Sequence, residues 1–106
     1  MIKFLKEASD FVWSAFQLLD FYEKDPNSSY VGTNSGIRLD GPYLLRINNN
    51  GILNLCKIRT NEDGNTRLTT IAHGYHEKSS QITYVGKLLS VYLEYLQRDE
   101  KAKRNE

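Results

Sequence analysis

The chain has 106 residues, of which 25% are charged and 40% hydrophobic, and its formal net charge is +1. This length supports one domain with a core that needs no disulfide or metal, and the balanced charge excludes a global field that would attract nucleic acid or a membrane surface. No apolar stretch approaches the ~18 residues that span a bilayer, so we expect no membrane partner.

Cys56 is the single cysteine, so no internal disulfide can form, and this favours a reducing compartment. Near the start of the sequence, Asp10 and Asp20 interrupt the apolar residues, and no signal peptide is expected. The sequence therefore predicts a cytoplasmic protein.

Residues 4–24 are predicted to form an amphipathic helix. Asp25-Pro26 ends it, because proline disfavours a helical residue before it. Apolar side chains recur in this segment at steps of three and four residues, which places them on one face. They are Phe4, Ala8, Phe11, Ala15, Leu18, Leu19 and Tyr22.

Between Tyr30 and His73 the apolar period changes to two, which predicts β-strands. Turn sequences rich in asparagine, aspartate and glycine separate the strands, and such short connections join antiparallel neighbours. We expect a meander of about three to five strands. They lie at Ile37–Asp40, Tyr43–Asn48, Ile52–Thr60 and Thr66–Ala72, with Tyr30–Thr33 as a further edge strand.

Residues 80–98 are predicted to form a second helix, and the mostly charged residues 98–106 a tail, so the ordered core of the single domain 1–106 covers about 4–97. The apolar stripe of this helix contains Ile82, Val85, Leu89, Tyr92, Leu93 and Leu96. A helix, an antiparallel meander and a helix define an α+β domain, a two-layer sandwich with both helices on one sheet face.

Both predicted helices carry more apolar surface than one sheet face needs. On the second helix the apolar sector widens to about 200° when Tyr84, Leu88, Val91 and Tyr95 are added to the stripe. On the first helix, Trp13 lies far from the apolar stripe. Packing of the two helices side by side is the alternative explanation, and it accounts for Phe16, Leu88 and Tyr84 more easily than for Trp13 and Phe21. Exposed tryptophan and tyrosine are enriched at binding hot spots. The candidate contacts are Trp13, Phe21, Tyr84, Leu88, Val91 and Tyr95.

This surplus predicts a non-enzymatic interaction protein that binds, and in one version inhibits, another macromolecule. The partner is a different protein or a second copy in a homodimer. Domains of this shape and size occur among small inhibitors and adaptors of phages and mobile elements, which suggests that type of role by analogy of shape alone.

Basic side chains of the strands suggest an alternative. If the helices cover the face that carries Leu45, Ile47, Ile58 and Leu68, the basic residues share the open face. A solvated face is the ordinary explanation, and a platform for nucleic acid or an acidic protein is the functional one. Single-strand binders add stacking aromatics, which do not accompany these residues. The candidates are Arg46, Lys57, Arg59 and Arg67.

A weaker alternative is a small metal-dependent hydrolase or nuclease at His73, His76 and Glu77, because two histidines and a carboxylate are ligand types of catalytic zinc. On a strand, however, these histidines do not converge. Cys56 lies between Asn54 and Ile58, a common setting for an inert buried cysteine. No nucleophile–base pair can be read from the spacing, so no catalytic residue, metal or cofactor is assigned and we expect no enzyme.

Overall fold

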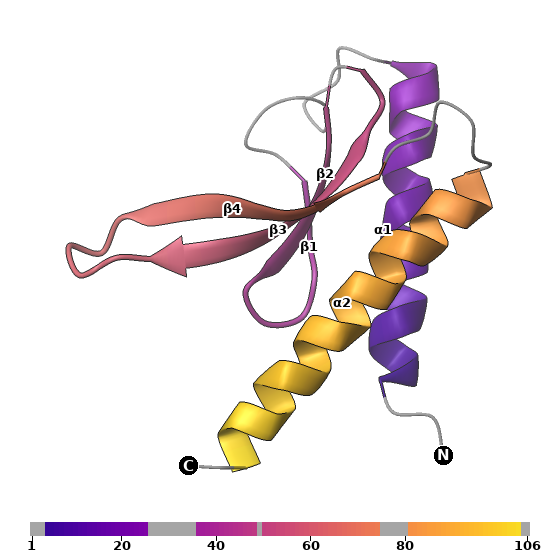
Figure 1. The fold of residues 1–106 in the computed structure, drawn as a ribbon. Coiled ribbons are helices and arrows are strands. Elements are labelled where there is room, and N and C mark those ends of the chain that lie inside the picture. The colour runs from indigo at the N-terminus through magenta and orange to yellow at the C-terminus, as the bar shows by residue number, and fades with distance from the viewer. Residues whose placement is uncertain (1–3, 26–35, 49, 75–80, 105–106) are drawn as a thin grey trace.

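The computed structural model describes residues 4–25, 36–48, 50–74 and 81–104, with Gln81 and Arg104 described by their backbone alone. The predicted α+β fold is confirmed: two helices flank a four-stranded antiparallel sheet of order β1-β2-β3-β4 (Figure 1). The predicted strand Tyr30–Thr33 lies outside the described residues. The elements are α1 (Leu5–Lys24), β1 (Ile37–Arg38), β2 (Tyr43–Ile47), β3 (Leu53–Thr60), β4 (Thr66–His73) and α2 (Gln81–Arg104).

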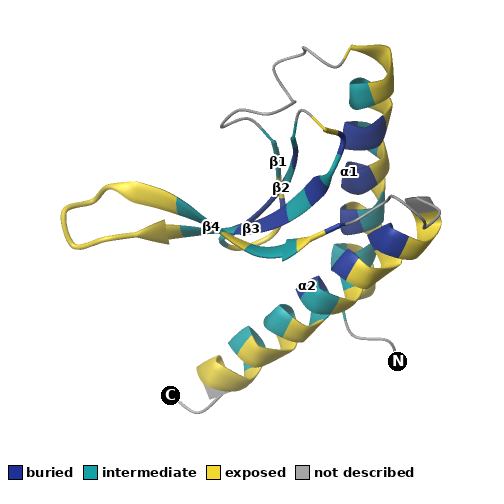
Figure 2. Cartoon of the chain, turned by 45° about the horizontal axis from the view of Figure 1, so that its top comes forward, coloured by how far each residue is buried: buried dark blue, intermediate teal, exposed yellow. Residues whose placement is uncertain are grey.

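The core lies between the two helices and one face of the sheet. On α1 the residues buried there are Phe11, Ala15, Leu18 and Leu19, as the three- and four-residue spacing predicts. Tyr22 packs against this cluster from its edge. Figure 2 shows the buried residues gathered where α1 and α2 meet β2 and β3. Neither helix is long and apolar enough to cross a membrane within the residues that the structure describes.

The register of β2 and β3 decides which sheet face the helices cover. Leu45 pairs with Leu55 and Ile47 with Leu53, and all four side chains are buried in the core. Because side chains alternate along a strand, Cys56 and Ile58 must point to the opposite face. Ile58 pairs there with Leu68. The expectation that the helices cover Ile58 and Leu68 together with Leu45 and Ile47 is therefore wrong.

The hairpin of β3 and β4 extends away from the body of the protein as an arm, on the side opposite α1 (Figure 1). The register shifts between Leu55 and Cys56, which leaves Ile71 as an extra residue on β4. Such a bulge bends a strand and increases its twist. Beyond it, every residue from Arg59 to Arg67 is exposed. We call residues 57–69 the arm.

The buried face of α2 differs from the predicted stripe. Tyr84, Val85, Leu88 and Tyr92 are buried, whereas Ile82 is 76% exposed. At about 100° per residue, the helix is rotated by roughly 80° from the orientation expected from sequence. The tyrosine-bearing flank is the one that packs, because aromatic rings of three elements meet there. The Tyr92 ring stacks on the Phe11 ring with 5.1 Å between the ring centroids, and it meets the Tyr43 ring edge-on with 5.5 Å between the centroids.

Gly74 permits this orientation of α2. A Cβ atom at position 74 would lie 2.6 Å from Tyr84 Cδ2 and 3.1 Å from Leu88 Cδ1. Only a residue without a side chain lets the end of β4 approach α2 so closely. The glycine therefore leaves room for the flank of α2 that carries Tyr84 and Leu88 to face the sheet.

The C-terminal half of α2 also corrects a prediction, because the helix continues through Arg104 and residues 98–104 are not a frayed tail. The Tyr43 hydroxyl donates a 2.6 Å hydrogen bond to Asp99 Oδ2, which ties this half of the helix to the sheet. One turn earlier, Arg98 Nη2 donates to Glu94 Oε1 at 3.0 Å. A side-chain anchor from a distant strand is not visible in the local composition from which the tail was predicted.

Candidate functional site

The most exposed apolar surface of α1 lies on the side of the helix opposite its core residues. Trp13 is 62% exposed, Leu5 61% and Phe16 36%. At about 100° per residue, these three side chains fall within a sector of roughly 80°, and the buried Phe11 and Leu18 lie on the far side of the helix. We call Leu5, Trp13 and Phe16 the outer α1 face. The helix is thus apolar on two sides, and only one of them is packed.

The remaining predicted contact residues do not join this face. Tyr84 and Leu88 are each 2% exposed and form part of the core, so the expectation that they are free to touch a partner is wrong. Val91 and Tyr95 are half-buried and pack against the same core. Phe21 is half-buried near the end of α1. The cause is the orientation of α2, which turns the flank that sequence reasoning regarded as surplus toward α1 and the sheet.

Two residues of the outer α1 face were not assigned from sequence. Leu5 is not among the contacts predicted from sequence, and Phe16 is attributed there to the alternative of packing between the helices. Leu5, Trp13 and Phe16 follow one another at steps of eight and three residues, which is itself a helical spacing. A search for a second apolar stripe on the same helix would have found them.

The four candidate basic residues are divided between the two faces of the sheet. Arg46 pairs with Asn54, and their side chains share the face of Cys56 and Ile58. Lys57, Arg59 and Arg67 point to the other face, the one that the helices cover near the body. The expectation of a single basic open face with all four is therefore wrong, because it rested on the wrong assignment of the covered face. The basic residues that remain together on one face are Lys57, Arg59 and Arg67 of the arm.

On the open face, Arg46 and Arg38 border a groove of about 460 Å³ with an apolar floor. Arg46 Nε is buried without a hydrogen-bond partner among the described residues. The floor residues are Leu44, Ile58 and Leu68.

The candidate metal site is not assembled by the described residues. His73 is exposed on β4, where its Nδ1 donates to Asn54 Oδ1 at 2.7 Å, and His76 and Glu77 lie outside the described residues. Among the residues that are described, no three histidine, cysteine, aspartate or glutamate side chains are placed to hold a metal ion. Cys56 is a buried free thiol whose Sγ lies 3.8 Å from Thr70 Oγ1.

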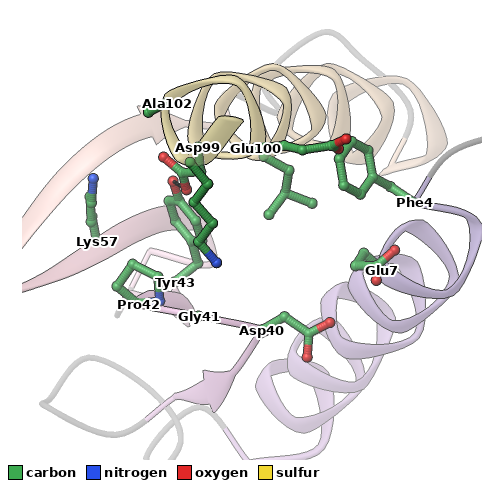
Figure 3. A pocket seen from close by; sticks show the side chains of 12 residues that line it. Phe4, Glu7, Asp40, Gly41, Pro42, Tyr43, Lys57, Asp99, Glu100 and Ala102 are labelled. Carbon is green, nitrogen blue, oxygen red and sulfur yellow. Dashed lines mark hydrogen bonds between the residues drawn. The ribbon is translucent and has the colours of Figure 1, made fainter. Parts of the chain in front are cut away.

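A groove of about 550 Å³ lies between the start of α1, the turn from β1 to β2 and the C-terminal half of α2 (Figure 3). Carboxylates come from all three sides: Glu7, Asp40, Asp99 and Glu100, with Lys57 and Lys103 also at its wall. Sequence reasoning missed this groove, because its residues come from four separate segments.

Tyr43 is not activated as a nucleophile or base in this groove. Tyr43 carries the one hydroxyl among its lining residues. Burial, followed by the hydrogen bond to Asp99 and the charge of that carboxylate, raises the pKa of Tyr43 far above the usual range. A nucleophile or general base needs a shift in the opposite direction, so Tyr43 remains protonated and acts as a structural donor.

Comparison with known proteins adds no family to this geometry. No protein-family model, no curated protein and no solved structure matches the chain.

Proposed function

We propose that this chain is a non-enzymatic interaction protein that binds another protein through the outer α1 face. The observation that carries the proposal is Trp13, a tryptophan that is 62% exposed beside Phe16 on a helix whose opposite side already fills the core. Tryptophan dominates the energetics of many interfaces because it buries a large rigid surface at little entropic cost.

The setting of Trp13 supports a contact role. Leu5 and Phe16 extend the apolar surface along the helix over about 16 Å, at ~1.5 Å per residue. Ion pairs stand beside this stripe: Lys6 with Asp10 at 3.3 Å and Lys24 with Asp20 at 3.0 Å. An apolar centre with a charged rim is the usual composition of a protein interface. Binding there would mask a partner's surface or link two partners, which is the inhibitor or adaptor role expected from sequence.

The partner is a second copy of this chain or a different protein of the same compartment. A reducing, cytoplasmic location is part of the proposal, since Cys56 is a free thiol.

The test compares three proteins: the wild type, the double variant Trp13→Ser with Phe16→Ser, and the control Ile82→Ser. Ile82 is even more exposed, at 76%, but lies on α2 outside the outer α1 face. Sedimentation equilibrium measures self-association, and quantitative capture from the native host measures a different partner. A hot-spot tryptophan contributes about 2 kcal/mol or more, so we expect the double variant to bind about 30-fold or more weakly. Equal binding by all three proteins would contradict the proposal.

A further inference from the structure

The arm places Arg59 and Arg67 against each other, and Lys57 lies near them with its ammonium 5.9 Å from the centre of the Tyr43 ring. Arg59 of β3 and Arg67 of β4 are direct cross-strand partners, so their side chains leave the same face of the ribbon next to each other. Lys57 lies two residues from Arg59 on the same face. Like charges directly opposite each other in a sheet are unfavourable. None of these three side chains has an ion pair with a carboxylate among the described residues.

The surroundings of this cluster are polar and arranged symmetrically about the turn. Going from the turn toward the body, Asn61 faces Asn65, Thr60 pairs with Thr66, and then Arg59 pairs with Arg67. These six residues border a hollow of about 490 Å³ near the end of the arm. Arginine, asparagine and threonine are residue types that contact phosphates and base edges.

The end of the arm is held in a defined shape. Asn61 Oδ1 accepts hydrogen bonds from the backbone N–H groups of Asp63 at 3.1 Å and Asn65 at 3.0 Å. Gly64 supplies the positive φ of 83° that the turn needs. A two-stranded ribbon that is fixed in this way and exposed on both sides has a size that the major groove of duplex DNA, about 12 Å wide, accepts.

We infer that the β3–β4 arm binds duplex DNA, with Arg59 and Arg67 on phosphates and Lys57 as a further cation at its root. A single strand is not favoured, because the arm, residues 57–69, contains no aromatic side chain on which bases would stack. Glu62 and Asp63 at the turn oppose a polyanion, so the flank of the ribbon and not its end makes the contact. This inference goes beyond the proposed function, since the arm points away from α1 (Figure 1).

The test is fluorescence anisotropy with a labelled duplex of about 20 base pairs, titrated at several salt concentrations, because phosphate contacts make affinity salt-dependent. The key variant is Arg59→Thr with Arg67→Thr. Its control, Lys6→Gln with Lys24→Gln, removes the same charge from exposed positions on α1. A third variant, Glu62→Gln with Asp63→Asn, removes the opposing charges.

We expect the arginine variant to bind about tenfold or more weakly at ~50 mM salt, with a slope of log affinity against log salt that is less negative by about two units. The lysine control should stay within about twofold of the wild type, and the third variant should bind more tightly. Trp13→Ser should leave DNA affinity unchanged, so failure of the proposed function is seen separately.

Four results would overturn the inference. They are no duplex binding by the wild type at low salt, equal losses in the arginine variant and the lysine control, tighter binding of the single strand than of the duplex, and binding of poly-glutamate in place of DNA through Arg59 and Arg67. The last result would assign the arm to an acidic protein surface.

Discussion

Removal of the Asp99 carboxylate is the perturbation that most directly tests how the C-terminal half of α2 is held. Asp99 accepts the 2.6 Å hydrogen bond from Tyr43, a residue with no exposed surface. In Asp99→Ala the Tyr43 hydroxyl loses the carboxylate that accepts its hydrogen bond while its ring stays in the core. An unsatisfied buried hydroxyl costs about 1–3 kcal/mol, so the free energy of unfolding should fall by that amount.

Tyr43→Phe is the matched control for this change. It removes the donor and leaves Asp99, which is half-buried, to be hydrated. The free energy of unfolding should fall by a smaller amount, about 0.5–1.5 kcal/mol, because the donor is gone and the Asp99 carboxylate is hydrated. The double variant should cost less than the two single changes added together, since they remove one shared interaction.

Urea unfolding gives these stabilities, and amide hydrogen exchange locates the effect. Asp99→Ala should accelerate exchange in α2 after Leu96 more than in α1. It should also lower the raised pKa of Tyr43, because the hydrogen bond and the charge of Asp99 both contribute to that elevation after burial itself. Unchanged protection of residues 97–103 together with additive energies would refute the anchoring role of Asp99.

Two further predictions concern the core. Gly74→Ala should lower the free energy of unfolding, measured in urea, by about 1–3 kcal/mol because the added Cβ would meet Tyr84. Its control, Gly86→Ala, has nothing within 4 Å of the added Cβ and should stabilise α2 by about 0.5–1 kcal/mol. Equal effects of the two substitutions would contradict the close approach of Gly74 to α2. Burial raises the pKa of Tyr92 from 10.0 to about 12 and also raises that of Tyr84. Because these folded-state pKa values lie above the unfolded ones, their stabilising contribution is present below pH 10 and lost as pH rises toward 12. The urea midpoint should therefore fall between about pH 10 and about pH 12, and a flat profile would contradict the burial of the hydroxyls.

The order and type of the elements could be predicted from the sequence because each depends on local patterns. The helix α1 is indicated by the three- and four-residue spacing of Phe11, Ala15 and Leu18. The turn between β3 and β4 is formed by contacts within the short segment Asn61–Asn65. Strand and helix bounds are accordingly close to the expected ones, except that α2 continues to Arg104. The two-sided character of α1 was partly visible, since Trp13 stood outside the core stripe.

The orientation of α2 and the choice of the covered sheet face could not be predicted in this way. A sector of about 200° on α2 allows several orientations. The one adopted brings Tyr84 against Gly74, which lies before the helix in the sequence. Alternation along β3 defines two faces but does not say which of them meets the helices. That assignment placed Arg46 with Arg59, although the register separates them.

Quenching of the emission of Trp13 tests the central claim most directly, because the chain contains one tryptophan. Acrylamide quenching should be efficient in the free chain, where Trp13 is 62% exposed. In the complex with the captured partner, or at a concentration where the chain self-associates, the account predicts a shift of the emission to shorter wavelength and a loss of quenching. Emission and quenching that are the same in the free and bound chain would contradict the assignment of the outer α1 face as the contact surface.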